Sequence, residues 1–226
     1  QERSRGLRVL DLTTIATYYN ELDGIHFCTK FTNPADDHRL RVHLRTGIKA
    51  QFIHTASAFG MVKRSLPKQK QSGELPIQSL GAVYDNSRGL AVFTRGLHSL
   101  EVLDEDNQAT LALTLLRSVG WLNKSKQVAS DSAQMQHDFV NEFMLMPLEP
   151  AHDKAKLLKT SLSYRAPLQA IQYSEKPKLS RHSYLELDND NIVMTALKAP
   201  ENGQGLVLRL LNSVEGDSGV HLKSRE

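Results

Sequence analysis

The amino-acid sequence predicts an all-β protein, a large antiparallel β-sandwich with one short helix near residues 151–162. Two observations carry this fold class. Polar and apolar side chains alternate strictly from His38 to Arg45, which is the period of a strand with one buried and one solvated face. Further strand-like segments follow at short intervals, separated by Gly, Pro, Asn and Asp, as in a sandwich and unlike alternating strand–helix units. The 226 residues suffice for one all-β domain.

The first strands are expected at Leu12–Tyr19, which is rich in Thr, Ile and Tyr, and at Ile25–Phe31, which alternates. Asn33–Asp37 contains residues that turn a chain. We therefore expect Ile25–Phe31 and His38–Arg45 to pair as an antiparallel hairpin, and the three strands to form a meander.

The middle of the chain is expected to contain five more strands, at Gln51–Thr55, Ile77–Tyr84, Leu90–Phe93, Leu100–Leu103 and Ala109–Leu116. Leu111–Leu116 is apolar on both faces, which predicts a central strand covered on two sides. Arg64–Glu74 is polar and is expected to be a loop. Ser118–Asp138 has little periodicity and is expected to be a long excursion of the kind that often carries function.

After a strand at Glu142–Leu148, the chain has its one helical pattern, Ala151–Leu162, with Ala155, Leu158 and Leu162 at helical spacing. Four strands follow, at Leu168–Tyr173, Tyr184–Leu187, Ile192–Leu197 and Gly205–Leu211, with 188–191 as a hairpin turn. Residues 1–212 are therefore expected to form the domain, and the polar residues 213–226 a weakly ordered tail.

Composition excludes several classes of function. The 28 Lys and Arg residues nearly balance 25 Asp and Glu, leaving +3, which does not indicate a nucleic-acid partner. The longest apolar stretch, Ala109–Leu116, is far shorter than the ~20 residues that span a membrane. Cys28, the single cysteine, cannot form an internal disulfide and suits a reducing compartment.

No catalytic constellation is evident from residue spacing. The nine His residues do not occur at metal-ligand spacing, and the glycine motifs that cradle phosphates or expose a nucleophilic serine are missing. The stripe Arg39, Arg41, His43 and Arg45 on one strand face could hold a carboxylate or a sugar phosphate. The alternative, which we favour, is a solvated face whose charges pair across strands.

Two places carry residue types that contact sugars. Asp85, Asn86 and Arg88 stand together at an expected turn, where they could bind sugar hydroxyls or simply make the turn. Trp121, the only Trp, could stack on a sugar ring, although burial against a sheet edge is the more common outcome.

Two runs in the middle of the chain, Gly89–Val102 (GLAVFTRGLHSLEV) and Leu111–Leu122 (LALTLLRSVGWL), resemble the C-terminal β-domain of glycoside hydrolase family 38, the retaining α-mannosidases. Supporting segments occur in the same order: Phe31–Val42 with Thr46–Gly47, and Ile192–Lys198 with Leu208–Asn212. The resemblance covers roughly Arg3–Asn212 and is closest to the bacterial, cytoplasmic branch that includes mannosylglycerate hydrolases. The chain departs from the family at Thr94, where Asn is usual, and at Gln136, where Gly usually precedes the residue matching His137.

This resemblance implies a super-sandwich of the galactose mutarotase-like kind that packs against the catalytic and helical domains of the same α-mannosidase. It implies that the excursion and the turn close one side of the α-mannoside site, with Asp85, Asn86, Arg88, Trp121 and His137 as substrate-proximal candidates. The family binds zinc through two Asp and two His of an N-terminal domain, and those motifs do not occur here. We therefore expect a cytoplasmic fragment of the enzyme that is inactive alone and could form a homo-oligomer.

Two other functions remain open. The chain could be a free-standing carbohydrate-binding β-module without a hydrolase partner. It could also be a mutarotase-like epimerase, which needs a His and a Glu facing one pocket; His98 and Glu101 are near each other in sequence.

Overall fold

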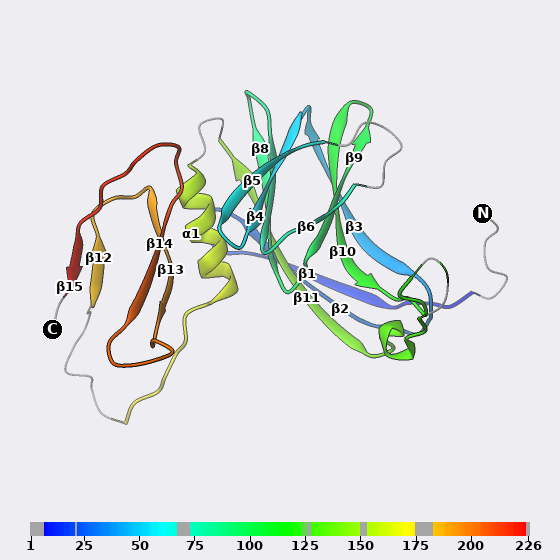
Figure 1. Cartoon of the computed structure of the whole chain (residues 1–226). Helices are drawn as coiled ribbons and strands as arrows, with labels where there is room; N and C mark the ends of the chain where they lie inside the picture. Colours follow the sequence, from blue (N-terminus) through cyan, green and yellow to red (C-terminus); the bar gives the residue numbers. More distant parts are fainter. Residues whose placement is uncertain are drawn as a thin grey trace.

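Two antiparallel sheets form the body of the molecule (Figure 1). The computed structural model describes residues 7–20, 22–66, 73–123, 125, 128–149, 153–174 and 183–224. In spatial order, the strands of the seven-stranded sheet are β1 (Leu12–Tyr18), β2 (Ile25–Thr32), β11 (Asp138–Leu148), β8 (Gly89–Arg95), β7 (Leu80–Tyr84), β4 (Phe52–Ser57) and β5 (Gly60–Ser65). Those of the four-stranded sheet are β3 (Arg39–Ile48), β10 (Gln108–Arg117), β9 (Ser99–Glu105) and β6 (Glu74–Pro76). The expected antiparallel sandwich is confirmed.

The main core lies between these two sheets. Leu111 and Leu113 of β10 are fully buried and belong to one apolar cluster with Val92 of β8 and Phe143 of β11. β10 lies between β3 and β9, and its residues from Ala109 to Leu116 are all buried, which confirms the expected central strand. Burial of this many apolar side chains is the main force that holds the two sheets together.

A second core lies on the outer face of the seven-stranded sheet. It is covered by helix α1 (Lys154–Arg165) and by the two-stranded sheet of β13 (Ile192–Lys198) and β14 (Val207–Asn212). Leu157 and Leu158 of α1 join Phe93 and Met146 of the large sheet in this cluster. Two short strands, β12 (Leu185–Leu187) and β15 (Leu222–Ser224), pair with each other beside this layer (Figure 1).

Ile25–Phe31 and His38–Arg45 do not pair as a hairpin, so this prediction is wrong. β2 pairs with β1 and with β11, whereas β3 pairs with β10 in the opposite sheet. The β1–β2 part of the expected meander is therefore confirmed, and the step to β3 is a crossover between layers. Asn33 is buried in this connection, where its side chain bonds a distant loop, so the segment does not form a simple turn.

The helix was expected at Ala151–Leu162 and instead begins at Lys154 and ends at Arg165. Its start is set by Asp153, whose carboxylate accepts a hydrogen bond from the backbone N–H of Ala155 at 2.7 Å, as an N-cap residue does. The expected residues 151 and 152 lie outside the described residues. Of the apolar positions at helical spacing, Ala155 and Leu158 are buried as expected.

Three other expectations differ from the structure. Leu168–Tyr173 forms no strand, and its large side chains are mostly solvent-exposed, so no sheet edge covers them. The hairpin expected at 188–191 does not form, because β12 pairs with β15 and β13 with β14. Leu222–Ser224 of the expected weakly ordered tail is a strand, tied down by the bond between the His221 ring and Asp188.

The expected loop Arg64–Glu74 falls partly on residues 67–72, outside the described residues, and β5 extends to Ser65.

The charged stripe of β3 is paired across strands, as we favoured. Arg39 lies 3.5 Å from Glu74 of β6, Arg41 contacts Glu101 of β9, and Arg45 lies 3.6 Å from Glu105. The β10 residues opposite Arg41 and Arg45 are Thr114 and Thr110, whose small side chains leave room for these two arginines to reach β9. The stripe therefore neutralises itself and leaves no unpaired row of cations. None of the described helices is long and apolar enough to cross a membrane.

Candidate functional site

The turn between β7 and β8 uses Asp85 and Arg88 for its own construction. Oδ1 of Asp85 accepts hydrogen bonds from the backbone N–H of Ser87 at 2.8 Å, from the Ser87 hydroxyl at 2.8 Å and from the backbone N–H of Arg88 at 3.1 Å. The Arg88 guanidinium donates to the carbonyl of Gly47, which fixes the neighbouring turn at the end of β3. The side chain of Asn86 is exposed at the tip.

These bonds set the charge of the turn. The backbone and hydroxyl hydrogen bonds from Ser87 favour the carboxylate form and lower the pKa of Asp85 to about 2. The Asp85 side chain is therefore ionised at neutral and mildly acidic pH. A shallow hollow of about 470 Å³ lies beside it, lined by Lys49, Gln51, Phe52, Tyr84, Asp85 and Asn86.

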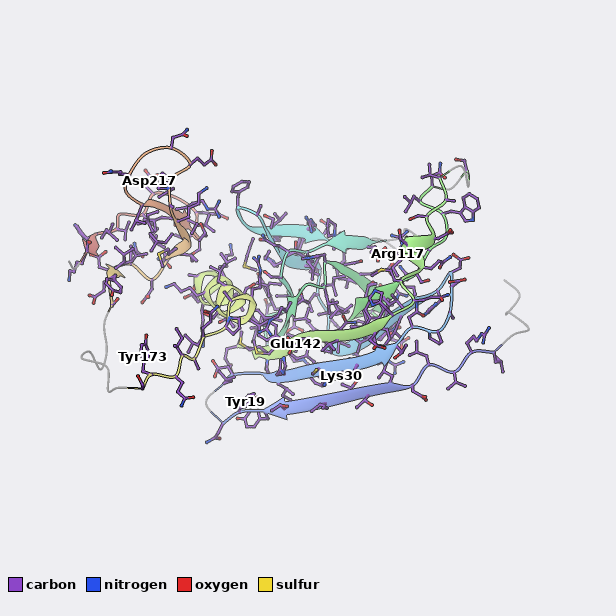
Figure 2. All side chains as sticks on the ribbon, turned by 90° about the horizontal axis from the view of Figure 1, so that it is seen from below. Tyr19, Lys30, Arg117, Glu142, Tyr173 and Asp217 are labelled. Carbon is purple, nitrogen blue, oxygen red and sulfur yellow. The ribbon has the colours of Figure 1, made fainter. Side chains whose placement is uncertain are left out.

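The excursion 118–137 begins after Arg117 and lies at the far end of the sandwich from α1 (Figure 2). Trp121 forms an isolated β-bridge with Ala129, and the N–H of Leu122 donates to the carbonyl of Val128 at 2.9 Å. The Trp121 side chain is 45 % exposed, so the burial that is common for a lone Trp does not occur here. An indole exposed to this extent offers aromatic surface to a ligand ring.

Hydrogen bonds of Asn33 and Gln134 hold the C-terminal part of the excursion in place. The buried amide of Asn33 donates to the carbonyls of Gln134 at 2.9 Å and Met135 at 3.1 Å, and Met135 adopts a left-handed conformation (φ 50°). The Gln134 side-chain oxygen accepts from the backbone N–H of Asp37 at 2.9 Å and from the hydroxyl of Ser118 at 2.7 Å. The short 3₁₀ helix Asp131–Gln134 (η1) is held in place by these bonds.

His137 lies on a polar hollow of about 410 Å³ beside η1. Its ring stacks on Phe139 with 4.2 Å between ring centroids, and its backbone carbonyl accepts from Asn33 at 3.0 Å. The hollow is lined by Asp36, Asp131, Ser132, Gln134, Met135, Gln136 and His137. Carboxylate, amide, hydroxyl and imidazole groups on an aromatic support are the side chains that bind sugar hydroxyls.

The structure does not bring the two groups of candidates together. Arg88 contacts Gly47 at one end of β3, whereas Ser118 donates to the carbonyl of His38 at the other end, at 2.8 Å. The two places are about 30 Å apart, because a strand rises about 3.3 Å per residue. Asp85, Asn86 and Arg88 therefore cannot contact the same small sugar as His137.

The spacing of residues in the sequence did not identify Asn33, Asp36 and Gln134 as part of the candidate site. The signal was present only as a turn-forming run at Asn33–Asp37 and a polar run before His137. Neither run shows that the two segments meet, because 97 to 102 residues separate their bonded pairs along the chain.

His98 and Glu101 are engaged separately. The His98 ring hydrogen-bonds the carbonyl of Ile77 at 3.3 Å, and Glu101 binds Arg41. Among the described residues, no three His, Cys, Asp or Glu side chains lie close enough to hold a metal ion.

Comparison with known proteins identifies relatives of this sandwich. The model of the glycosyl hydrolases family 38 C-terminal domain matches residues 12–126, half of the chain. A putative mannosylglycerate hydrolase of Halalkalibacterium halodurans is 27 % identical over 222 residues, which covers 93 % of this chain and 24 % of that protein.

Two solved structures share the architecture over nearly the whole chain. They are a family 38 glycosyl hydrolase from Enterococcus faecalis (TM-score 0.86) and an α-mannosidase from Enterococcus faecalis V583 (TM-score 0.87). Each is 28 % identical and is matched over 98 % of this chain and 26 % of its own. The chain thus spans about a quarter of the length of these relatives, and by its match to the family model it belongs to glycoside hydrolase family 38, as a C-terminal domain.

Proposed function

We propose that this chain is the C-terminal domain of a retaining α-mannosidase that hydrolyses α-mannosides, and that it has no hydrolase activity alone. The observation that carries the proposal is the match of almost the whole sandwich to about a quarter of an α-mannosidase. In the intact enzyme the domain packs against the catalytic and helical domains. A cytoplasmic location is part of the proposal and is supported by the single free cysteine, Cys28.

We assign catalysis in retaining hydrolysis to another domain of the enzyme. It needs two carboxyl groups about 5–5.5 Å apart, one as nucleophile and one as acid and base. Glu74, Glu101 and Glu105 of the four-stranded sheet are instead paired with arginines, and Glu142 of β11 is paired with Arg95. The zinc ion implied by family 38 needs a donor set that the described residues do not assemble, so it does not fit in this part of the chain.

We assign sugar contact to the excursion. Its hollow presents Gln136 and His137 of the excursion, held in place by Asn33, beside Asp36 of the β2–β3 connection, whose carboxylate accepts a hydrogen bond from Gln136 at 2.6 Å. Trp121 offers an exposed ring on the same excursion. A loop that is polar but well fastened suits substrate positioning, because little conformational entropy is lost when the sugar binds. The turn at Asp85 faces a different end and serves as a fastening of β3 to the large sheet.

The test uses the polypeptide encoded by the complete reading frame and the 226-residue chain side by side. With an aryl α-mannoside and zinc, the complete protein is expected to turn over substrate. His137→Ala in the complete protein is expected to raise KM, and the matched control Asn86→Ala, at the opposite end, to leave KM unchanged. Equal effects of the two substitutions would remove the excursion from the sugar site.

A free-standing carbohydrate-binding module is the second candidate, favoured by the exposed Trp121 beside a polar excursion. Calorimetry of methyl α-mannoside with the 226-residue chain discriminates between the two. Saturable binding that is lost in Trp121→Ala, together with a reading frame that encodes no further domain, would establish the module. The α-mannosidase proposal predicts no saturable binding by the chain alone, since the rest of the sugar site belongs to another domain.

A further inference from the structure

A third hollow, of about 310 Å³, lies where three separate elements meet. It is bounded by the tip of the β4–β5 hairpin, the C-terminal half of α1 and the β13–β14 pair, and Figure 1 shows α1 between the two hairpins. Its volume is at the lower end of the range for small-molecule pockets. It is remote from the excursion and from the turn at Asp85, which share none of its lining residues.

Arg209 of β14 is held in position at this hollow by an irregularity in β13. The pairing register shifts between Met194 and Ala196, so Thr195 has no partner residue on β14. The Thr195 hydroxyl accepts a hydrogen bond from Nε of Arg209 at 2.9 Å and donates one to the Arg209 carbonyl at 3.2 Å. Bulges commonly re-aim a side chain. Here the bulge fixes the guanidinium through Nε, and no bond from its two terminal nitrogens is found within the part of the chain that the structure describes.

Arg165, in the last turn of α1, lines the same hollow. A cation in this position usually compensates the negative C-terminal end of a helix. Arg95 already does so, because its Nε and Nη2 donate to the carbonyl of Tyr164 at 3.2 and 2.7 Å. No ion pair among the described residues involves Arg165 or Arg209, whereas Arg39, Arg41, Arg45 and Arg95 each contact a glutamate.

The rest of the lining is neutral. It contains no Asp or Glu. The polar side chains of Ser57, Gln78, Ser161 and Thr195 line it, together with an apolar wall that includes Leu158 and Leu162. Two guanidinium groups without a carboxylate favour an anion, and a planar guanidinium binds phosphate or carboxylate through two parallel hydrogen bonds. We propose that this hollow is a binding site for a compact oxyanion, the phosphate or carboxylate group of a small molecule.

Calorimetry of the 226-residue chain tests this site with inorganic phosphate, acetate and neutral mannose as probes. At low ionic strength, saturable binding of phosphate or acetate is expected, and no binding of mannose in this hollow. Whichever anion binds more tightly identifies the group that the site prefers. Added sodium chloride is expected to weaken binding, because these exposed charges are screened.

Three variants locate the binding. Arg209→Gln and Arg165→Gln are each expected to weaken it by about tenfold, the effect of losing one charged hydrogen-bond partner. Thr195→Val keeps the charge but releases the guanidinium, and a smaller loss is expected. Arg8→Gln, an exposed change of equal charge outside the hollow, is the matched control and should bind like the unmodified chain. Circular dichroism confirms that each variant is folded. No saturable anion binding, or equal binding by the Arg209→Gln, Arg165→Gln and Arg8→Gln variants, overturns the proposal.

Discussion

The guanidinium of Arg41 on β3 pairs with the carboxylate of Glu101 on β9 across the intervening strand β10. The pair passes over the small side chains of Ala112 and Thr114, which are the β10 partners of Glu101 and Arg41. Only 19 % of the Arg41 side chain and 13 % of the Glu101 side chain are exposed. Three strands of the outer face are thus linked by one charged contact, which is partly shielded from water.

Removing one partner of this pair is expected to destabilise the fold. Arg41→Met leaves the Glu101 carboxylate partly buried without its cation, which costs about 1–3 kcal/mol of unfolding free energy. Urea unfolding measures the change. Arg45→Met is the matched control, because the Arg45 side chain is 86 % exposed and such pairs contribute only about 0–1 kcal/mol. Equal losses in the two variants would show that shielding of the Arg41 pair does not matter.

The amide of Asn33 is expected to set the order of the excursion. Asn33→Ala removes both bonds to the carbonyls of Gln134 and Met135, and about 1–3 kcal/mol of stability, since these acceptors lose their partners. Hydrogen exchange is expected to accelerate over 118–137. Asn86→Ala, at the exposed tip of the other turn, should leave exchange there unchanged. Unaltered protection of the excursion in Asn33→Ala contradicts this role.

Asp85 is expected to make stability depend on pH in the acid range. Its folded pKa of about 2 is below the ordinary value of 3.8, so the carboxylate stabilises the fold above about pH 4 and this contribution is lost as the pH falls toward 2. Asp85→Asn retains a turn-forming side chain but not the charge. The urea midpoint of the variant should lie below that of the unmodified chain at pH 6 and approach it near pH 2. A constant difference across this range argues against the assignment.

Strand β1 is expected to promote self-association into a homo-oligomer. It is an edge strand of seven residues without a charged side chain, and Leu12, Ile15 and Tyr18 are 43 %, 51 % and 66 % exposed. Such an edge is open to pairing with a second copy. Ile15→Lys is expected to lower the sedimentation coefficient at high protein concentration, and Val207→Lys, at an exposed apolar site outside β1, serves as control. A chain that sediments as a monomer at every concentration refutes the expectation.

Much of the fold was predictable because strand alternation is a local signal. The two-sided apolar run of Leu111–Leu116 indicated a central strand, and its neighbours Ala109 and Thr110 are buried as well. The partner of a strand is not a local property. The alternation of His38–Arg45 identified which side chains share a face, but nothing in it shows that β3 pairs with a strand some 70 residues later instead of with β2.

The same difference between local and distant contacts decides which parts of the candidate sites could be predicted. Asp85, Asn86 and Arg88 were correctly placed in a turn, because turn-forming residues act on their own backbone. The fastening of the excursion depends on Asn33 and Gln134, which are 101 residues apart, and burial of a single amide has no signature in composition. The bulge at Thr195 was equally hidden, since the strand pattern of Ile192–Leu197 continues through it.

The most direct test of the central claim is the hydrolysis of an aryl α-mannoside by the purified 226-residue chain in the presence of zinc. If the chain is the C-terminal domain of an α-mannosidase whose nucleophile and acid belong to another domain, release of the aryl group will match the buffer blank. Turnover above the blank that disappears on chelation of the metal would contradict the account.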